Sequence, residues 1–152
     1  MIVLILLAIG IAAAVIVAVA ISAKDAKATP PDDLVLLSGA GDFDFNIVGE
    51  SYRQDEIAAV AGGRTEDGVR LETHADLSPE ANNPHDANAV AVSIDGHHVG
   101  YLSRADAIQY RTRFGTRKAM CGALIVGGWD RGGRDRGHFG VRLDIDEDWS
   151  VI

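Results

Sequence analysis

The loop at residues 82–90 carries the densest set of side chains suited to chemistry in this chain, Asn-Asn-Pro-His-Asp-Ala-Asn-Ala-Val. Pro84 restricts Asn83 to extended conformations, and Asp86 is a residue type that folds back onto backbone amides. Asn83, His85 and Asp86 would then present an amide, an imidazole and a carboxylate. Two interpretations stay open: a stiff structural turn, or a hydrogen-bonding site at the mouth of a barrel.

No complete catalytic or metal-binding motif accompanies this loop. The sequence lacks Gly-x-Ser-x-Gly and His-Glu-x-x-His, and residues 39–45 lack the Gly-Lys-Ser/Thr of a phosphate-binding loop. None of the five histidines pairs with Cys121 at zinc-finger spacing, and the acidic residues 144–148 lack the glycine and the distal glutamate of a calcium loop. We therefore expect neither an enzyme nor a metal or cofactor site.

Basic side chains concentrate in one part of an acidic chain. The net charge is −8, yet residues 104–143 hold nine basic and three acidic residues, a local charge of +6. Several of these arginines fall on an expected helix, and others fall in a Gly-rich loop beside Trp129. Basic groups interleaved with an aromatic ring suit single-stranded nucleic acid, whereas a solvated helix face and a plain hairpin loop are the alternative. The arginines that these two segments offer as secondary contacts are Arg111, Arg113, Arg131, Arg134 and Arg136.

The clearest element beside the loop is a β-hairpin. Two alternating apolar and polar runs, residues 89–94 and 97–102, flank Asp95-Gly96. This dipeptide favours a type I′ turn, which needs positive φ at both central residues. The side chains expected in the core are Val90, Val92 and Ile94.

A helix follows the hairpin directly. Ser103 with Asp106 three positions later resembles a capping box, so a helix is expected from there to about Phe114, ending at Gly115. One face of this helix, at spacings of three and four, would be buried. Its members are Ala107, Tyr110 and Phe114.

The remaining pattern indicates mostly short strands. Strands are expected at residues 44–49, 69–75, 119–126 and 139–145, with a short helix at 55–61. These short elements, mostly strands, within about 100 residues predict a mainly β protein, a small closed or partly open barrel with two short helices.

The N-terminal segment predicts a membrane anchor. Residues 2–21 contain no charged side chain, and twenty helical residues span about 30 Å, the thickness of a hydrocarbon core. A cleaved signal peptide is the main alternative, although no basic residue precedes the run. Lys24 and Lys27 follow it, so we expect a single-pass protein of the cell membrane with its C-terminal domain in the cytoplasm.

These segments define four expected regions. Residues 1–23 form the transmembrane helix, and residues 24–42, which contain two prolines, form a linker. The folded domain occupies residues 43–147, and residues 148–152 form a short acidic tail.

Three phrases in order resemble the HIRAN domain: FNIVGESY at 45–52, NNPHDANAVAV at 82–92 and HHVGYLSRADA at 97–107. This module accompanies some DNA-remodelling helicases and also occurs alone in bacterial proteins. The resemblance implies an OB-like β-barrel with two helices. It also implies single-stranded DNA as the partner, bound at a free 3′-hydroxyl end.

The resemblance also assigns roles to individual residues. Tyr52 matches an aromatic residue on which a base stacks, and Tyr101 matches a pocket position. Asn83 and Asp86 match loop residues near the terminal nucleotide, with Asp86 as an acceptor for the 3′-hydroxyl. Arg104 matches a basic residue near a phosphate. Helicase or hydrolase activity in the family is expected from neighbouring modules.

Two departures favour a second hypothesis. Ser51 stands where DNA-binding members have an arginine, and His85 stands where they have a tyrosine. Loss of a stacking ring costs about 1–3 kcal/mol. The alternative is therefore a membrane-anchored protein-interaction module that kept the barrel and lost DNA binding.

Overall fold

The computed structural model describes residues 33–152, so the predicted transmembrane helix at residues 2–21 lies outside the described part of the chain. Among residues 33–152, no helix combines the length and the apolar character that a bilayer span requires. The predicted mainly β class with two α-helices is confirmed. The elements are β1 (Val35–Leu36), β2 (Phe45–Asn46), η1 (Glu50–Tyr52, a 3₁₀ helix), α2 (Gln54–Ala61), β3 (Val69–Pro79), β4 (Val90–Ile94), β5 (His97–Tyr101), α3 (Arg104–Phe114), β6 (Ala119–Gly127) and β7 (Phe139–Asp144).

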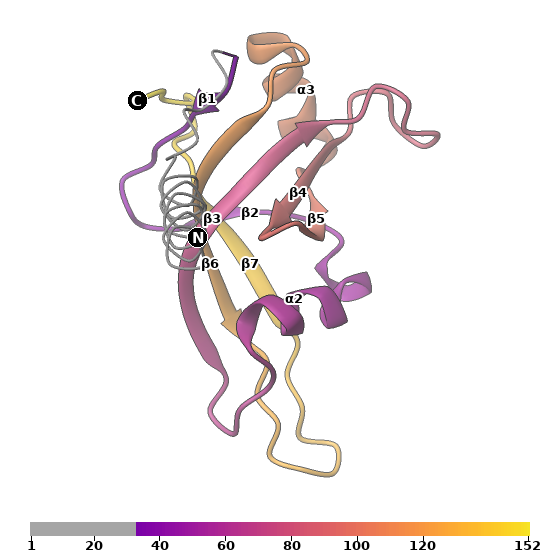
Figure 1. Cartoon of the computed structure of the whole chain (residues 1–152), viewed down its shortest axis with the longest axis vertical. Helices are drawn as coiled ribbons and strands as arrows, with labels where there is room; N and C mark the ends of the chain where they lie inside the picture. The colour runs from indigo at the N-terminus through magenta and orange to yellow at the C-terminus, as the bar shows by residue number, and fades with distance from the viewer. Residues whose placement is uncertain (1–32) are drawn as a thin grey trace, which may run out of the picture. The chain divides into compact units, whose positions relative to one another are not determined.

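One curled sheet contains all the strands (Figure 1). Its order is β2-β7-β6-β3-β4-β5 with antiparallel neighbours, and β1 pairs in parallel with β6. Two residues beyond the end of β2, Val48 forms an isolated antiparallel bridge with Tyr101 of the other edge strand, β5. The sheet is therefore a curled half-barrel, the open form of the closed or partly open barrel that we expected.

The predicted hairpin is confirmed as β4 and β5. Asp95 and Gly96 have φ of 49° and 80°, as a type I′ turn requires. The three side chains expected in the core, Val90, Val92 and Ile94, are fully buried. The hairpin thus carries Tyr101, its last residue, to the edge of the sheet.

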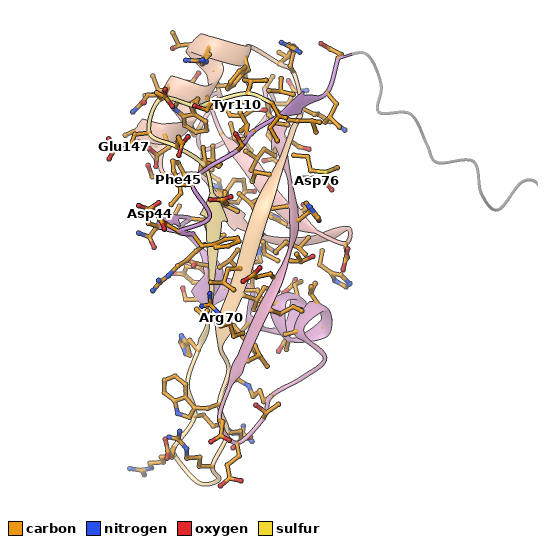
Figure 2. The ribbon with its side chains drawn as sticks, turned by 90° about the vertical axis from the view of Figure 1, so that its left-hand side faces the viewer. Asp44, Phe45, Arg70, Asp76, Tyr110 and Glu147 are labelled. Carbon is orange, nitrogen blue, oxygen red and sulfur yellow. The ribbon has the colours of Figure 1, made fainter. Side chains whose placement is uncertain are left out.

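The predicted helix after the hairpin is confirmed as α3. The Ser103 hydroxyl accepts a hydrogen bond from the Asp106 N–H at 3.2 Å, and the helix ends at Gly115. Its buried face is Ala107, Tyr110 and Phe114, as expected. Tyr110 also packs edge-on against Trp149, which in turn packs against Phe45. Figure 2 shows Phe45 and Tyr110 toward the end of the sheet where α3 lies.

The sheet extends further in sequence than its local patterns indicate. β3 continues through residues 76–79, beyond the strand expected at 69–75, because this stretch pairs with β4 and buries Leu77. Within the expected linker, β1 pairs with β6 and buries Val35. Within the expected acidic tail, Trp149 is only 4% exposed and the Ile152 N–H donates to the Leu36 carbonyl. Apolar side chains therefore hold both segments on the sheet.

Candidate nucleic-acid interface

A pocket lies where the two edges of the sheet meet. Val48 and Tyr101 exchange two backbone hydrogen bonds, of 2.8 and 2.9 Å. Beside them is a pocket of about 260 Å³, close to the lower limit of common small-ligand sites. Six residues were expected from the sequence to contact nucleic acid directly, and all of them except Tyr52 line this pocket: Asn83, His85, Asp86, Tyr101 and Arg104. Its apolar wall consists of Val48, Ala89 and Leu102.

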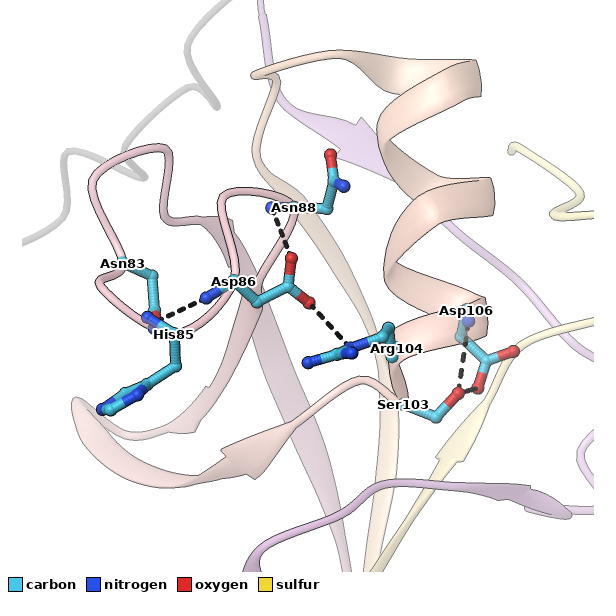
Figure 3. A network of polar contacts seen from close by, with 7 residues as sticks. All are labelled: Asn83, His85, Asp86, Asn88, Ser103, Arg104 and Asp106. Carbon is cyan, nitrogen blue, oxygen red and sulfur yellow. Dashed lines mark hydrogen bonds and ion pairs between the residues drawn. The ribbon is translucent and has the colours of Figure 1, made fainter.

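The loop at one side of the pocket is held by its own side chains (Figure 3). The Asn83 Oδ1 accepts hydrogen bonds from the N–H groups of His85 and Asp86, at 2.9 and 3.2 Å. The Asp86 Oδ1 accepts a third, from the Asn88 N–H, at 2.8 Å. The expected folding back of Asp86 onto the backbone is therefore present. It fixes the direction of the Asp86 carboxylate.

Asp86 directs its second oxygen toward α3 (Figure 3). The Asp86 Oδ2 lies 3.8 Å from the Arg104 Nε, a distance for an ion pair without a close hydrogen bond. The Asp86 side chain is 24% exposed, whereas the Arg104 side chain is 78% exposed. Asp86 thus keeps acceptor capacity at the pocket, and the Arg104 guanidinium extends into solvent where a phosphate can reach it. The Ser103 cap fixes the start of the helix that carries Arg104.

Glu80 is a site residue that the sequence patterns did not indicate. Its Oε2 accepts hydrogen bonds from the Asn83 Nδ2 at 2.8 Å and from the Tyr101 hydroxyl at 3.3 Å. Burial, followed by the charge of Glu80, raises the pKa of Tyr101. Glu80 stands three residues before Asn83, which is the spacing of a turn, and the Asn83 N–H donates a hydrogen bond to the Glu80 carbonyl. This spacing is the one feature of the sequence that could have indicated Glu80.

Tyr52 lies outside this pocket. It ends the 3₁₀ helix η1, four residues after Val48, and the residue is 88% exposed. The residues that line the pocket do not include it. Tyr52 is therefore a solvent-exposed ring on the segment leading away from the pocket wall.

The secondary arginines fall into two separate groups. Arg111 and Arg113 lie in the last turn of α3, about 10 and 14 Å along the helix from Arg104. Arg113 donates to the Asp148 carbonyl at 2.8 Å. The structure thus places both on the helix that borders the pocket, but at the helix end away from it.

The other three arginines lie in the β6–β7 loop, at the opposite end of the sheet from α3 (Figure 1). Arg131 and Arg136 pair with Asp135 and Asp130 of the same loop, at 3.6 and 2.8 Å. The hydrogen bond from Arg136 lowers the pKa of Asp130. Arg134 is exposed. This loop is therefore partly neutralised internally and does not join the pocket.

Metal and thiol chemistry find little support in the described part of the chain. Residues 33–152 contain no cluster of three or more His, Cys, Asp or Glu side chains that could hold a metal ion. Cys121 is 2% exposed, and burial raises the pKa of its thiol to about 12, so the reactive thiolate is strongly disfavoured. The pocket's own groups offer hydrogen bonding, ring contacts and charge, which suit binding.

Comparison with known proteins supplies the family. The model of the HIRAN domain family matches residues 40–116, which is half of the chain. No curated protein and no solved structure matches the chain. All the residues that line the pocket fall within the matched range, whereas the β6–β7 loop falls outside it. The chain therefore belongs to the HIRAN domain family, which implies that it binds nucleic acid, with DNA as the partner.

Proposed function

We propose that the pocket binds the end of a single DNA strand and recognises its free 3′-hydroxyl. The observation that carries this proposal is that five residues from three separate segments line one pocket. They are Asn83, His85, Asp86, Tyr101 and Arg104. The pocket combines a fixed acceptor, a ring and a solvent-facing guanidinium, which are the groups that a strand terminus needs.

Each group has a distinct task. The Asp86 Oδ2, held at 3.8 Å from Arg104, accepts the hydrogen bond of the 3′-hydroxyl. A phosphate at the same position would place a second anion against the Asp86 carboxylate. Arg104 contacts a backbone phosphate, Tyr101 packs against the terminal nucleotide, and the exposed Tyr52 ring stacks on a base nearer the 5′ side.

The test compares strands that differ only at the 3′ end. The full chain in detergent is titrated with a short single strand bearing a 3′-hydroxyl or a 3′-phosphate. We expect the hydroxyl strand to bind at least about tenfold more tightly, because burying an unpaired charge or losing a charge-assisted hydrogen bond costs about 1.5–3 kcal/mol. Asp86→Asn should abolish most of this difference.

Asp95→Asn is the matched control, since it removes the same charge. Asp95 lies in the hairpin turn, where Asn-Gly is equally favourable. Its preference for the hydroxyl end should equal that of the wild type. Equal affinity of the wild type for both ends would rule out recognition of the 3′-hydroxyl.

One observation favours a protein-interaction module as the second candidate. The Asp86 carboxylate already pairs with Arg104, which is largely in solvent, and a second carboxylate, that of Glu80, accepts a hydrogen bond from Tyr101. His85, at the pocket, also stands where DNA-binding members of the family have a tyrosine. If the full chain binds no strand even at low salt, this second function is the better account.

We further propose that residues 2–21 tether the domain to the cell membrane, with the domain in the cytoplasm. The support is the uncharged run itself and the two lysines that follow it. The chain should stay in the membrane fraction after alkaline carbonate washing, and protease added to intact cells should leave the domain uncut. Release by carbonate, or cleavage from outside, would contradict this placement.

A further inference from the structure

We propose that Glu80 is a positioning residue that gives the pocket its preference for a strand end without a phosphate. This inference rests on the proposed function. It assigns a role to a residue that lies behind the pocket and does not line it. Glu80 follows β3 directly and is half-buried, and two hydrogen bonds hold its carboxylate in place.

The first step is that one oxygen of Glu80 joins two elements. The Glu80 Oε2 accepts from Asn83, in the loop, and from Tyr101, at the end of β5. The backbone of Glu80 is fixed as well, because its N–H donates to the Ala89 carbonyl at 2.8 Å. The carboxylate therefore ties the loop wall of the pocket to the strand wall.

The second step is that this contact decides which way the Asn83 amide faces. With the Nδ2 of Asn83 on Glu80, its Oδ1 is directed to the N–H groups of His85 and Asp86. Those bonds hold the loop in the shape that aims the Asp86 carboxylate at the pocket. Loss of Glu80 would free the amide to rotate, and the acceptor for the strand terminus would lose its fixed position.

The third step concerns charge. A hollow of about 760 Å³ adjoins the pocket and shares Asn83, His85 and Tyr101 with it, and Glu80 lines this hollow. A phosphate on the strand end would meet Asp86 on one side and Glu80 behind Tyr101. Two fixed negative charges oppose a phosphate more strongly than one does, while an uncharged hydroxyl is unaffected.

The test separates position from charge with two variants of the full chain. Glu80→Gln keeps an oxygen acceptor and removes the charge, whereas Glu80→Ala removes both. We expect Glu80→Gln to hold the affinity for the 3′-hydroxyl strand within about threefold and to narrow the preference over a 3′-phosphate by about fivefold or more. Glu80→Ala should weaken binding of the hydroxyl strand by about tenfold.

Glu66→Gln is the control, because Glu66 is an exposed residue in the turn before β3. It should change neither the affinity nor the preference. An independent readout is the absorbance titration of Tyr101: without the Glu80 charge its pKa should fall. If Glu80 only supported the structure, Glu80→Gln, which keeps the oxygen acceptor, would leave the preference between the two strand ends unchanged.

Three outcomes decide the matter. If Glu80→Gln narrows the preference for the 3′-hydroxyl strand over the 3′-phosphate strand and lowers the pKa of Tyr101, the role of Glu80 is supported. A wild-type preference that Glu80→Gln leaves unchanged overturns that role and leaves the proposed function standing. A wild type that binds no strand overturns the proposed function, and the selection by Glu80 with it.

Discussion

Val48 and Tyr101 exchange both of their backbone hydrogen bonds and thereby join the two edges of the sheet at the wall of the pocket. Gly100, which precedes Tyr101, also allows the two edges of the sheet to meet. A Cβ on Gly100 would lie 2.6 Å from the Val48 carbonyl oxygen and 2.9 Å from the Ile47 Cδ1. The absence of a side chain at position 100 is what permits the two edges to approach. Closure and the shape of the pocket therefore depend on the same backbone contact.

Gly100→Ala should destabilise the domain by about 1–3 kcal/mol, because the added methyl group must displace the Val48 backbone carbonyl as well as the Ile47 side chain. Denaturant unfolding measures the change. Gly140→Ala is the matched control, since a Cβ there would meet only the Val126 Cγ2, at 3.7 Å. If the two variants unfold at the same denaturant concentration, the close approach at Gly100 carries no energetic weight.

Local signals predicted the elements whose geometry is set by adjacent residues. Asp95-Gly96 fixes its own turn, and Ser103 with Asp106 caps its own helix, so both were predictable from a few letters. Asn83 and Asp86 belong to the same class, because their hydrogen bonds reach only two or three residues along the chain. The resemblance to HIRAN sequences then indicated which of these local structures belong to one site.

Long-range contacts were not predictable in the same way. β1 was hidden in the expected linker because its pairing partner, β6, lies more than 80 residues away. Trp149 stands among acidic residues, and nothing near it in sequence indicates the rings of Phe45 and Tyr110. The contact between Glu80 and Tyr101 likewise depends on how β3 and β5 are placed around β4.

Arg104→Ala should reduce the salt dependence of binding to single strands. One lost phosphate contact lowers the slope of log K against log salt by about 0.7. The measurement is a series of titrations from low to moderate salt. Arg70→Ala is the control: Arg70 pairs with Glu72 on β3, about 30 Å along that strand from the pocket loop, and Figure 2 shows it well away from α3. An unchanged slope for Arg104→Ala would mean that its guanidinium contacts no phosphate.

Arg134→Ala should affect long strands only. The β6–β7 loop begins where β6 pairs with Val69, and β3 carries the chain about 33 Å from there to the pocket loop. At the 3.4 Å spacing of stacked bases this distance corresponds to about ten nucleotides. A strand of about five nucleotides should bind Arg134→Ala as it binds the wild type, and a strand of about fifteen should bind about threefold less tightly.

Arg131→Ala provides the comparison within the same loop. Arg131 already pairs with Asp135 at 3.6 Å, so its loss should weaken the binding of long strands less than the loss of Arg134. Equal weakening of short and long strands by Arg134→Ala would place the loop near the pocket in the complex, contrary to its position in the free domain.

Cys121 should make the domain less stable in alkaline solution. Burial raises the pKa of its thiol from the ordinary 9.0 to about 12 in the folded state. Below pH 9 the thiol is protonated in both states, whereas between pH 9 and 12 only the unfolded chain releases the proton. The free energy of unfolding should therefore fall with rising pH across this window, by up to about 1.4 kcal/mol per pH unit from this group. Urea unfolding at several pH values measures the slope, and Cys121→Ala should flatten it.

Because Tyr110 is also buried with a raised pKa, some loss of stability in alkaline solution should remain in the Cys121→Ala variant. Identical slopes for the two proteins would show that the thiol ionises as easily in the folded domain as in the unfolded chain.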